Sequence, residues 1–407
     1  MKKILYIHHG KGLGGAPLSL LYLIENLDKT KFEPVVLFLQ DSEVIELYKK
    51  KNIKVYGPLN LNDFSHTKIH WYRWYHPHLF IKVILDNIKT YFWIAKKWID
   101  QIQPDIIHFN TSSLTIWAKV AKKKKIPVVF HVREPLADGY LGIRKRIIKN
   151  WVGKYSDFIT PISNNDAKPW AGNNKVNVIY NAVDGKKFDK NLSAETFFKK
   201  YNLSKTDPKI LFLGGLSQEK GTLNILKIFE QLLKILPEAK LIMAGYFDLS
   251  INNIFSLKRY FPTQRYKIRV KKILKKIIKS MIFTGPIKDV ELSIAACDVL
   301  VVPSVVGHFA RPIIEAGFMQ KPVIAAKTSP LDELLIHGHT GYLLNINKSE
   351  MWVEKLYALL TNKQLNEQMG KNGYDFCLKN FNIQDHVKSF EQIYNKILEK
   401  EQNVISN

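Results

Sequence analysis

Short, uninterrupted apolar runs alternate with longer stretches of helical periodicity along most of this chain, and this alternation limits the folds that it can adopt. Runs of about four to eight residues rich in Val, Ile and Phe are typical of parallel strands that are covered on both faces. With helical stretches between them, such strands predict a doubly wound α/β domain. In the first half, strands are expected at Lys3–His8, Pro34–Leu39, Ile53–Tyr56, Asp105–Phe109, Val128–His131 and Phe158–Ile162.

The same alternation returns in the second half, so we expect the same architecture twice, although no residue-level repeat accompanies it. The second set of strands is expected at Ile210–Leu213, Lys240–Ala244, Met281–Phe283, Val299–Val302, Pro322–Ala325 and Gly341–Leu344. Between the two sets, Asp184–Lys209 is polar and contains Asp-Gly and Asp-Pro turn signals. These signals indicate a hinge there.

Apolar residues at helical spacing occupy much of the chain between these strands. The expected helices are Ala16–Leu27, Ile81–Ile102, Leu114–Ala121, Thr222–Leu236, Lys267–Lys279, Val290–Ala296, Arg311–Met319 and an amphipathic tail helix, Phe381–Lys400. A chain of 407 residues exceeds what one hydrophobic core usually serves. We therefore predict an N-terminal Rossmann-like domain at 1–190, a C-terminal Rossmann-like domain at 191–380, and a terminal helix at 381–407.

Composition restricts the class of protein further. Apolar residues make up 46% of the chain and charged residues 24%, as in globular rather than disordered proteins. The two cysteines, Cys297 and Cys377, are too few for a disulfide framework or a cysteine-rich metal site, and they fit a reducing cytoplasm. His8 and His9 end the first apolar run too early for a signal peptide. No segment approaches the roughly 18 apolar residues of a membrane span.

A glycine-rich turn joins the first strand to the first helix, with glycines at positions 10, 12, 14 and 15. Backbone amides in such a turn can bind an anion, although glycines also serve simple tight turns. The glycine spacing is not that of the dinucleotide fingerprint, and no acidic residue ends the second strand. Both observations disfavour an oxidoreductase.

Two later segments combine a strand end, a loop and a helix start. Lys220 opens a helix after the turn Gly214-Gly215, which suits a diphosphate, although a solvated surface lysine is the alternative. Glu315 is expected in the first turn of the helix that starts near Arg311. A carboxylate there can accept hydrogen bonds from a ribose diol, or simply balance the helix dipole.

These segments resemble family 4 of the retaining glycosyltransferases, which has the GT-B fold, and the resemblance covers nearly the whole chain. Gly14-Gly15 match the N-terminal Gly-Gly loop of the family, and Val178–Asp184 match its Ile-Pro-Asn-Gly-Val-Asp link with substitutions. Gly214–Gly221 match its Gly-Arg-Leu-x-x-x-Lys-Gly turn, and Phe309–Ala316 match the region of its two glutamates. The resemblance implies an α/β protein with two Rossmann-like doubly wound domains facing a central cleft. It also implies a C-terminal helix that crosses back to the N-terminal domain, retention of configuration and no bound metal.

The resemblance also implies roles for individual residues. The donor site is expected to comprise Gly214, Gly215, Lys220, Ile287, Phe309, Ala310, Arg311 and Glu315, with Lys220 at the diphosphate, Ile287 beside the base and Glu315 at the ribose. His131, at the end of an N-terminal strand, is expected to contact the sugar and to act with Glu315 in catalysis. Gly14, Gly15 and Arg133 are expected to form an acceptor or phosphate loop. Arg133 and Glu134 either bind the acceptor or pair with each other.

Two positions depart from the family pattern. Gly215 replaces the arginine that holds donor phosphate, and Gly307 replaces the first glutamate, which touches the transferred sugar. One hypothesis is that Arg311 supplies the missing charge, in which case an arginine at position 215 should partly rescue the loss of Arg311. The alternative is that Arg311 points to solvent or pairs with a nearby acid.

A formal net charge of +25 indicates an anionic partner, unless the lysines are simply solvated. Ile251–Ser280 holds ten basic residues and no acidic one, and Trp71–Phe80 interleaves aromatic and basic residues, with further aromatics to Trp98. Both segments suit an anionic membrane surface. The alternative for the first segment is a helix whose apolar stripe packs on the sheet, and the alternative for the second is an aromatic patch in the core. Single-stranded nucleic acid would also suit the aromatics, but we do not expect it as a partner.

No metal site is predicted. The histidine groups His8-His9, His66/His70 and His76/His78 lack carboxylates at a useful spacing.

We therefore expect a metal-independent, hexosyl-type glycosyltransferase that is cytoplasmic and associates peripherally with the membrane. It would move a sugar from a UDP- or GDP-linked nucleotide-sugar to a glycan or lipid-linked acceptor, with no further cofactor. The alternative is a non-catalytic relative that keeps the fold and acts as a binding or scaffold subunit, which Gly215 and Gly307 favour.

Overall fold

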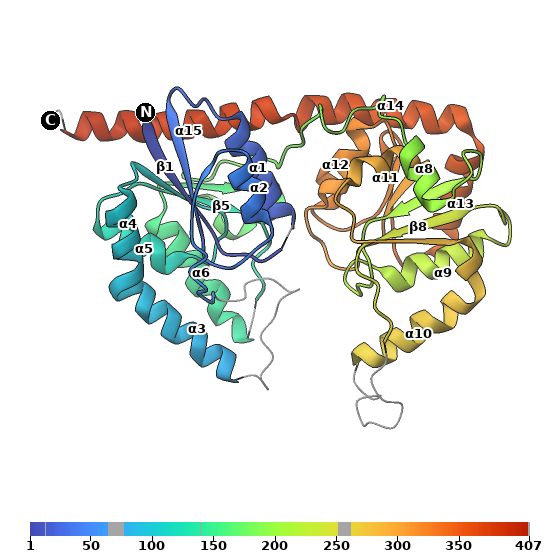
Figure 1. Cartoon of the computed structure of the whole chain (residues 1–407), viewed down its shortest axis with the longest axis horizontal. Coiled ribbons are helices and arrows are strands. Elements are labelled where there is room, and N and C mark those ends of the chain that lie inside the picture. Colours follow the sequence, from blue (N-terminus) through green and yellow to red (C-terminus); the bar gives the residue numbers. More distant parts are fainter. Residues whose placement is uncertain (13, 64–76, 139, 251–261, 406–407) are drawn as a thin grey trace. The chain divides into compact units, whose positions relative to one another are not determined.

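The computed structural model describes residues 1–12, 14–63, 77–138, 140–250 and 262–405. The chain forms two compact units (Figure 1). The first consists of Met1–Ala182 together with Ile383–Asn407, and the second of Val183–Asn382. Each unit is an α/β domain built on its own parallel sheet.

A six-stranded sheet in the order β3-β2-β1-β4-β5-β6 forms the centre of the first unit. Its strands are β1 (Lys2–His8), β2 (Phe32–Phe38), β3 (Lys54–Tyr56), β4 (Ile106–Phe109), β5 (Val128–Val132) and β6 (Phe158–Pro161). All neighbouring strands pair in parallel. Each strand expected in the first half is present, and its ends differ by at most two residues.

Helices cover both faces of this sheet. They are α1 (Gly15–Asn26), α2 (Val44–Lys50), α3 (Pro77–Lys89), α4 (Ala95–Ile102), α5 (Thr115–Lys123), α6 (Ile143–Tyr155), α7 (Asn164–Ala167) and α15 (Ile383–Ile405). Ile4 and Tyr6 of β1 belong to a core formed with α1, α2 and α15, whereas Leu5 and Ile7 belong to a core formed with α4, α5 and α6. Burial on both faces explains why the strands are continuously apolar.

The helix expected at Ile81–Ile102 is longer and interrupted. It begins as α3 at Pro77, passes through a π-helical turn at Thr90–Ile94, and continues as α4. The hydroxyl of Thr90 donates to the carbonyl of Asp86 at 2.7 Å, a contact that commonly accompanies helix distortion.

The second unit repeats the topology of the first. Its strands are β7 (Lys209–Phe212), β8 (Lys240–Ala244), β9 (Met281–Gly285), β10 (Val299–Val302), β11 (Val323–Ala326) and β12 (Gly341–Leu344), in the order β12-β11-β10-β7-β8-β9. Read from the opposite edge, this is the strand order of the first sheet. The helices are α8 (Glu195–Tyr201), α9 (Thr222–Leu232), α10 (Pro262–Ile277), α11 (Val290–Ala296), α12 (Arg311–Phe318), α13 (Ser349–Thr361) and α14 (Lys363–Asn380).

The basic helix α10 packs its apolar stripe on the second unit. Val270, Leu274 and Ile277 are buried in the core that also holds β7, β8 and α9. Of the two alternatives for this helix, the structure therefore shows the one in which the apolar stripe faces the sheet. No helix in the ranges given above combines the length and hydropathy that a membrane span requires.

The two units divide after Ala182 and after Asn382, not at residues 190 and 380. The amide of Val183 donates to the carbonyl of Phe381 at 3.2 Å, and Phe188 is buried. Residues 183–190 therefore belong to the second unit, and the tail that joins the first unit begins at Ile383.

The helix α15 is part of the core of the first unit, where Phe390, Ile393 and Tyr394 pack with α1 and β1. We predict that Ile393→Ala lowers the free energy of unfolding by about 2–5 kcal/mol, because it leaves a cavity in this core. Lys396→Ala, on the exposed side of the same helix, is the control and should change it by less than about 0.5 kcal/mol. Denaturant unfolding measures both, and equal effects would mean that the helix is not anchored through Ile393.

Candidate functional site

Each sheet has one point at which its strand order reverses, between β1 and β4 in the first unit and between β7 and β10 in the second. Ligands of open α/β sheets bind outside the carboxyl ends of the strands at such points. The loops that leave the sheet there carry most of the residues that the sequence singles out.

In the second unit, a tight turn after β7 carries Gly214 and Gly215. The amide of Gly215 donates to the carbonyl of Ala244 at 2.9 Å, and its φ of +56° lies in the left-handed region. A Cβ atom at this position would lie 2.5 Å from the carbonyl oxygen of Tyr246. A side chain at position 215 would therefore force this backbone to shift, which argues against the expectation that an arginine there would partly rescue the loss of Arg311.

Thr222 holds the rest of this turn in place. Its buried hydroxyl accepts from the amide of Ser217 at 2.9 Å and lies 2.8 Å from the carbonyl oxygens of Gly215 and Ser217. Because α9 begins at Thr222, Lys220 lies on the fixed loop just before the helix, and it is exposed. An ammonium there can meet an anion beside the helix N-terminus.

The loop after β10 lies directly against the same turn. A Cβ atom on Gly221 would lie 1.8 Å from the carbonyl oxygen of Pro303, and the amide of Val305 donates to the carbonyl of Glu219 at 2.8 Å. The two loops therefore form one assembly at the reversal point.

Gly307, in the second of these loops, packs its backbone against another backbone segment. A Cβ atom there would lie 1.9 Å from the carbonyl oxygen of Ser329. A glutamate at this position, as in the family pattern, would therefore require one of the two segments to move.

Arg311 and Glu315 form a buried ion pair on α12. The Nε atom of Arg311 lies 2.6 Å from Oε1 of Glu315, and the two side chains are 15% and 2% exposed. Since α12 begins at Arg311, Glu315 is in the second helical turn, and the expectation that it lies in the first turn is wrong. Of the alternatives for Arg311, the structure shows pairing with a nearby acid. A carboxylate has about four lone-pair sites, so Glu315 keeps acceptor capacity beyond this pair.

The remaining expected donor residues lie at the same edge of the sheet. Ala310 is the N-cap of α12 and is buried, and Phe309 precedes it. Ile287 follows β9, which β8 separates from β7. His308, which the sequence reasoning missed, lies with its Nδ1 atom 3.1 Å from the carbonyl oxygen of Val306, and desolvation lowers the pKa of its ring.

In the first unit, His131 lies at the end of β5 and is fully buried. Its Nδ1 atom lies 3.3 Å from Nη2 of Arg133 and 3.2 Å from Nε2 of His108. Burial, and then the charge of Arg133, hold the pKa of His131 well below its usual value, so the ring is neutral. Because a guanidinium can only donate, Nδ1 accepts and the ring hydrogen is on Nε2. That Nε2 atom has no partner among the described residues.

A chain of hydrogen bonds connects His131 with the terminal helix α15. With Nδ1 of His131 as the acceptor, Nε2 of His108 donates to it, and Nδ1 of His108 then accepts from the hydroxyl of Tyr394 at 2.7 Å. Because the hydroxyl of Tyr394 already donates to His108, the hydroxyl of Tyr6, which lies 3.1 Å away, donates to Tyr394. The orientation of His131 therefore depends on a helix that follows it by more than two hundred residues in the chain.

His8, at the end of β1, is oriented by the same arginine. Nε of Arg133 donates to Oδ1 of Asn110, which fixes the amide so that Nδ2 donates to Nδ1 of His8 at 3.0 Å. Burial lowers the pKa of His8 well below its usual value, so the neutral ring carries its hydrogen on Nε2. This atom has no partner in the part of the chain that the structure describes. His8 and His131 each provide a buried Nε2–H group at the carboxyl edge of the sheet.

Arg133 itself is buried and also donates to Oδ1 of Asn181 at 2.8 Å. Asn110, Asn181 and His131 therefore hold its guanidinium within the first unit. Sequence reasoning also missed His8 and Asn110 as site residues. A polar residue at the carboxyl end of a buried strand was the signal that could have found both.

The Gly14-Gly15 loop adjoins this network. Gly14 is the N-cap of α1, and both glycines are exposed. Nδ2 of Asn110 also lies 3.3 Å from the carbonyl oxygen of Ala16, so the start of α1 lies beside the asparagine that orients His8.

The described residues contain no group of three or more His, Cys, Asp or Glu side chains that could hold a metal ion. His66, His70 and His76 lie outside the described residues.

Two family models match this chain. The model described as Glycosyltransferase Family 4 matches residues 13–187, and the model described as Glycosyl transferases group 1 matches residues 193–376. The chain belongs to glycosyltransferase family 4. An oxidoreductase, which the glycine spacing already disfavours, is thereby set aside.

Two curated proteins are similar to this glycosyltransferase over much of its length. An uncharacterised glycosyltransferase of Methanocaldococcus jannaschii is 26% identical over 307 residues, which cover 71% of this chain and 73% of the relative. The N-acetyl-alpha-D-glucosaminyl L-malate synthase of Bacillus anthracis is 21% identical over 252 residues, which cover 61% and 62%.

Solved structures show that the fold is GT-B. The Anabaena protein HepE in complex with UDP matches with a TM-score of 0.75 at 18% identity, over 97% of this chain and all of HepE. The sucrose-phosphate synthase of Thermosynechococcus elongatus matches with a TM-score of 0.71 at 16% identity, over 98% of this chain and all of that protein.

We predict that Gly307→Ala destabilises the glycosyltransferase by about 1–3 kcal/mol, because the added methyl group would overlap the carbonyl of Ser329. Gly15→Ala is the control, since its added Cβ atom meets nothing within 4 Å. A thermal melt of the two variants measures the difference. If Gly307→Ala melts with the wild type, the close approach of the two backbones does not exist.

We predict that His8 and His131 both carry their hydrogen on Nε2 at neutral pH and keep it there as the pH falls to 6, because burial depresses both pKa values. Nitrogen NMR of histidine-labelled protein distinguishes the two tautomers. A hydrogen on Nδ1 of His131 would contradict the hydrogen-bond directions given for this site.

Tyr394→Phe should cost about 1 kcal/mol of stability through the lost hydrogen bond to His108.

Proposed function

We propose that this glycosyltransferase moves a hexose from a UDP- or GDP-linked donor to a glycan or lipid-linked acceptor, with retention of configuration and without a bound metal ion. The observation that carries the proposal is the assembly at the reversal point of the second sheet, where a fixed glycine turn and an exposed Lys220 adjoin the loop that leads into α12, the helix that holds the buried Glu315. HepE, a structural neighbour, has been solved with UDP and with UDP-glucose, which supports a uridine nucleotide as one candidate donor.

In this proposal the donor binds to the second unit. Lys220, beside the N-terminus of α9, meets the diphosphate, since a cation at the positive end of a helix dipole suits an anion. Glu315 accepts hydrogen bonds from the ribose, and Ile287 lies beside the base. Because Arg311 is paired with Glu315, we assign it the role of orienting that carboxylate. Lys220 then takes the larger share of the phosphate charge.

The first unit supplies hydrogen-bond donors to the sugar and a loop for the acceptor. The Nε2–H group of His131 is neutral and fixed in direction, so it suits a sugar hydroxyl and does not suit proton transfer at neutral pH. Arg133 positions this group, and the Gly14-Gly15 loop presents amides to an acceptor or phosphate. Catalysis then rests on positioning the reactants and on stabilising the departing diphosphate.

A non-catalytic binding or scaffold subunit is the second candidate. The packing of backbone at Gly215 and Gly307 favours it, because the family side chain at either position would require the neighbouring backbone to move. Donor hydrolysis by the purified chain discriminates the two, since a scaffold binds nucleotide without turning it over.

We also propose peripheral association with an anionic membrane on the cytoplasmic face. Large apolar side chains are exposed along α3, the π-turn and α6, among them Phe80, Phe92, Trp93 and Ile147. Basic residues accompany them on the same helices. Exposed aromatics next to lysines suit a headgroup region. The apolar stripe of α10 is buried, so that helix contributes charge at most.

We predict that Lys220→Ala and Glu315→Gln each weaken binding of the nucleoside diphosphate about tenfold or more, through the loss of about 1.5–3 kcal/mol from a charge-assisted hydrogen bond. Lys220→Ala should leave the affinity for the nucleoside alone unchanged, because only the phosphates meet the ammonium. Lys234→Ala, an exposed lysine near the far end of α9, is the matched control. His131→Ala should reduce turnover much more than nucleotide affinity.

Calorimetric titration with UDP, GDP and the nucleosides measures these affinities. If both variants bind the diphosphates as the wild type does, the donor site is not at this edge of the second sheet.

A further inference from the structure

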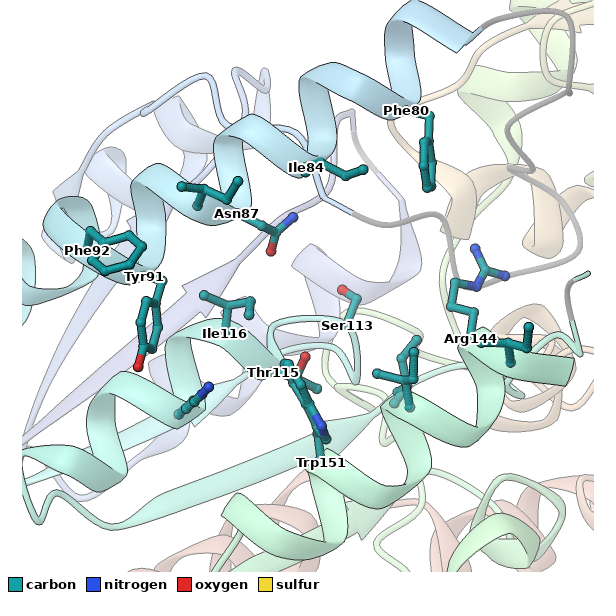
Figure 2. Close-up of a pocket in the computed structure, with 15 residues that line it drawn as sticks. Phe80, Ile84, Asn87, Tyr91, Phe92, Ser113, Thr115, Ile116, Arg144 and Trp151 are labelled. Atoms are coloured by element: carbon teal, nitrogen blue, oxygen red, sulfur yellow. The ribbon is translucent and has the colours of Figure 1, made fainter.

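A groove opens between the α3–π-turn segment, α5 and α6 of the first unit (Figure 2). Its volume is about 720 Å³, within the roughly 300–1,000 Å³ typical of small-molecule sites. The lining is mostly aliphatic and aromatic, and includes Phe80, Ile84, Tyr91, Ile116, Ile147 and Trp151. Figure 2 shows Phe80 and Ile84 of α3, and Tyr91 of the π-turn, extending from the upper ribbon toward the side chains of α5 and α6.

Several of these lining side chains are exposed to solvent. Phe80 is 52% exposed, Ile88 45% and Ile147 45%. A large contiguous apolar surface on a protein commonly marks a site that binds a ligand, another protein or a membrane. The groove therefore suits an apolar ligand.

We propose that this groove holds the hydrocarbon chain of a lipid-linked acceptor. The inference rests on the proposed function, in which the acceptor binds to the first unit, and it identifies the class of acceptor as a lipid with a phosphorylated head.

One residue that lines the groove belongs to the loop that also carries a residue of the site. Ser113 lines the groove, and it ends a run of four buried polar residues that begins at Asn110, the residue that orients His8. Within this run the hydroxyl of Ser112 is fully buried and has no partner among the described residues. A lipid with its head beside the Nε2–H groups of His8 and His131 would thus have its chain in the groove.

Basic residues predominate on the helices around the groove, which favours an anionic head; one carboxylate, that of Asp63, accepts from the hydroxyl of Ser113. The helix α6 carries five basic residues and no acidic one. In α3 the single acidic residue, Asp86, is buried and accepts hydrogen bonds from the amide and side chain of Asn62. Inside the groove, the ammonium of Lys119 lies 4.8 Å from the ring centre of Tyr91. A second copy of this chain, with a net charge of +25, would bring like charge to this surface.

The test uses the full chain and a series of alkyl phosphates of increasing length, each below its micelle concentration, with calorimetry as the readout. Affinity should rise about fourfold with each methylene that enters the groove, and should stop rising when the groove is full. Ile147→Asp should lower the affinity for dodecyl phosphate about tenfold or more, because a carboxylate would then face the hydrocarbon chain in the groove. Ile147→Leu should retain it.

Ile235→Asp is the matched control, since Ile235 is a similarly exposed isoleucine on the second unit, and it should bind dodecyl phosphate as the wild type does. Circular dichroism melts check that each variant is folded. Equal losses in Ile147→Asp and Ile235→Asp would overturn the proposal, as would an affinity that does not depend on chain length.

Two further measurements separate this inference from the proposed function. If the wild type binds UDP or GDP but no alkyl phosphate, the groove proposal fails and the donor site stands. If it binds alkyl phosphates but neither nucleotide, the proposed function fails. Binding to vesicles of phosphatidylglycerol and phosphatidylcholine, without binding of monomeric alkyl phosphate, would show a bilayer contact only and would overturn the proposal.

Discussion

Strands of a parallel sheet all point the same way, so every loop that follows a strand lies at one edge, and the chemistry of this glycosyltransferase depends on that constraint. In the second unit it brings the loops after β7 and β10 so close that Gly221 touches Pro303. In the first unit it brings His8, Asn110 and His131 together from three different strands. Because both sheets have the same strand order, each unit builds its site from the same positions in the topology while using different residues.

Within the first unit, one buried charge organises the polar side chains. A guanidinium removed from water must keep its hydrogen bonds, and Arg133 makes them to Asn110, Asn181 and His131. Since arginine can only donate, each partner must accept, and this determines which nitrogen of each neighbouring histidine carries the hydrogen. The result is a pair of neutral, directed N–H groups, which suit the recognition of hydroxyls and phosphate oxygens. A lysine at the same position has no planar guanidinium with which to donate to three partners in fixed directions.

The strands could be predicted because burial on both faces leaves a continuous apolar run, which is visible in a single sequence. Lys220 and Glu315 could be found because they belong to local strand–loop–helix motifs. The partnership of His108 with Tyr394 could not, because 286 residues separate them and neither has a local signal. The helix α6 was missed because its Ile143 and Ile147 face solvent, so its apolar residues do not mark a buried face. At Gly215 and Gly307 the sequence shows only that a side chain is missing, whereas the structure shows that backbone occupies its place.

The histidines of the first unit also couple its folding to acidity. Four of them, His8, His108, His131 and His386, are buried with pKa values below the usual one, and burial lowers the pKa of His386 to about 4. In the unfolded chain each would titrate near pH 6.5. Below that pH the unfolded state binds more protons than the folded state, so each histidine removes about 1.4 kcal/mol of stability per pH unit until its folded pKa is reached. The same burial that fixes the hydrogen-bond donors therefore makes this unit labile to acid.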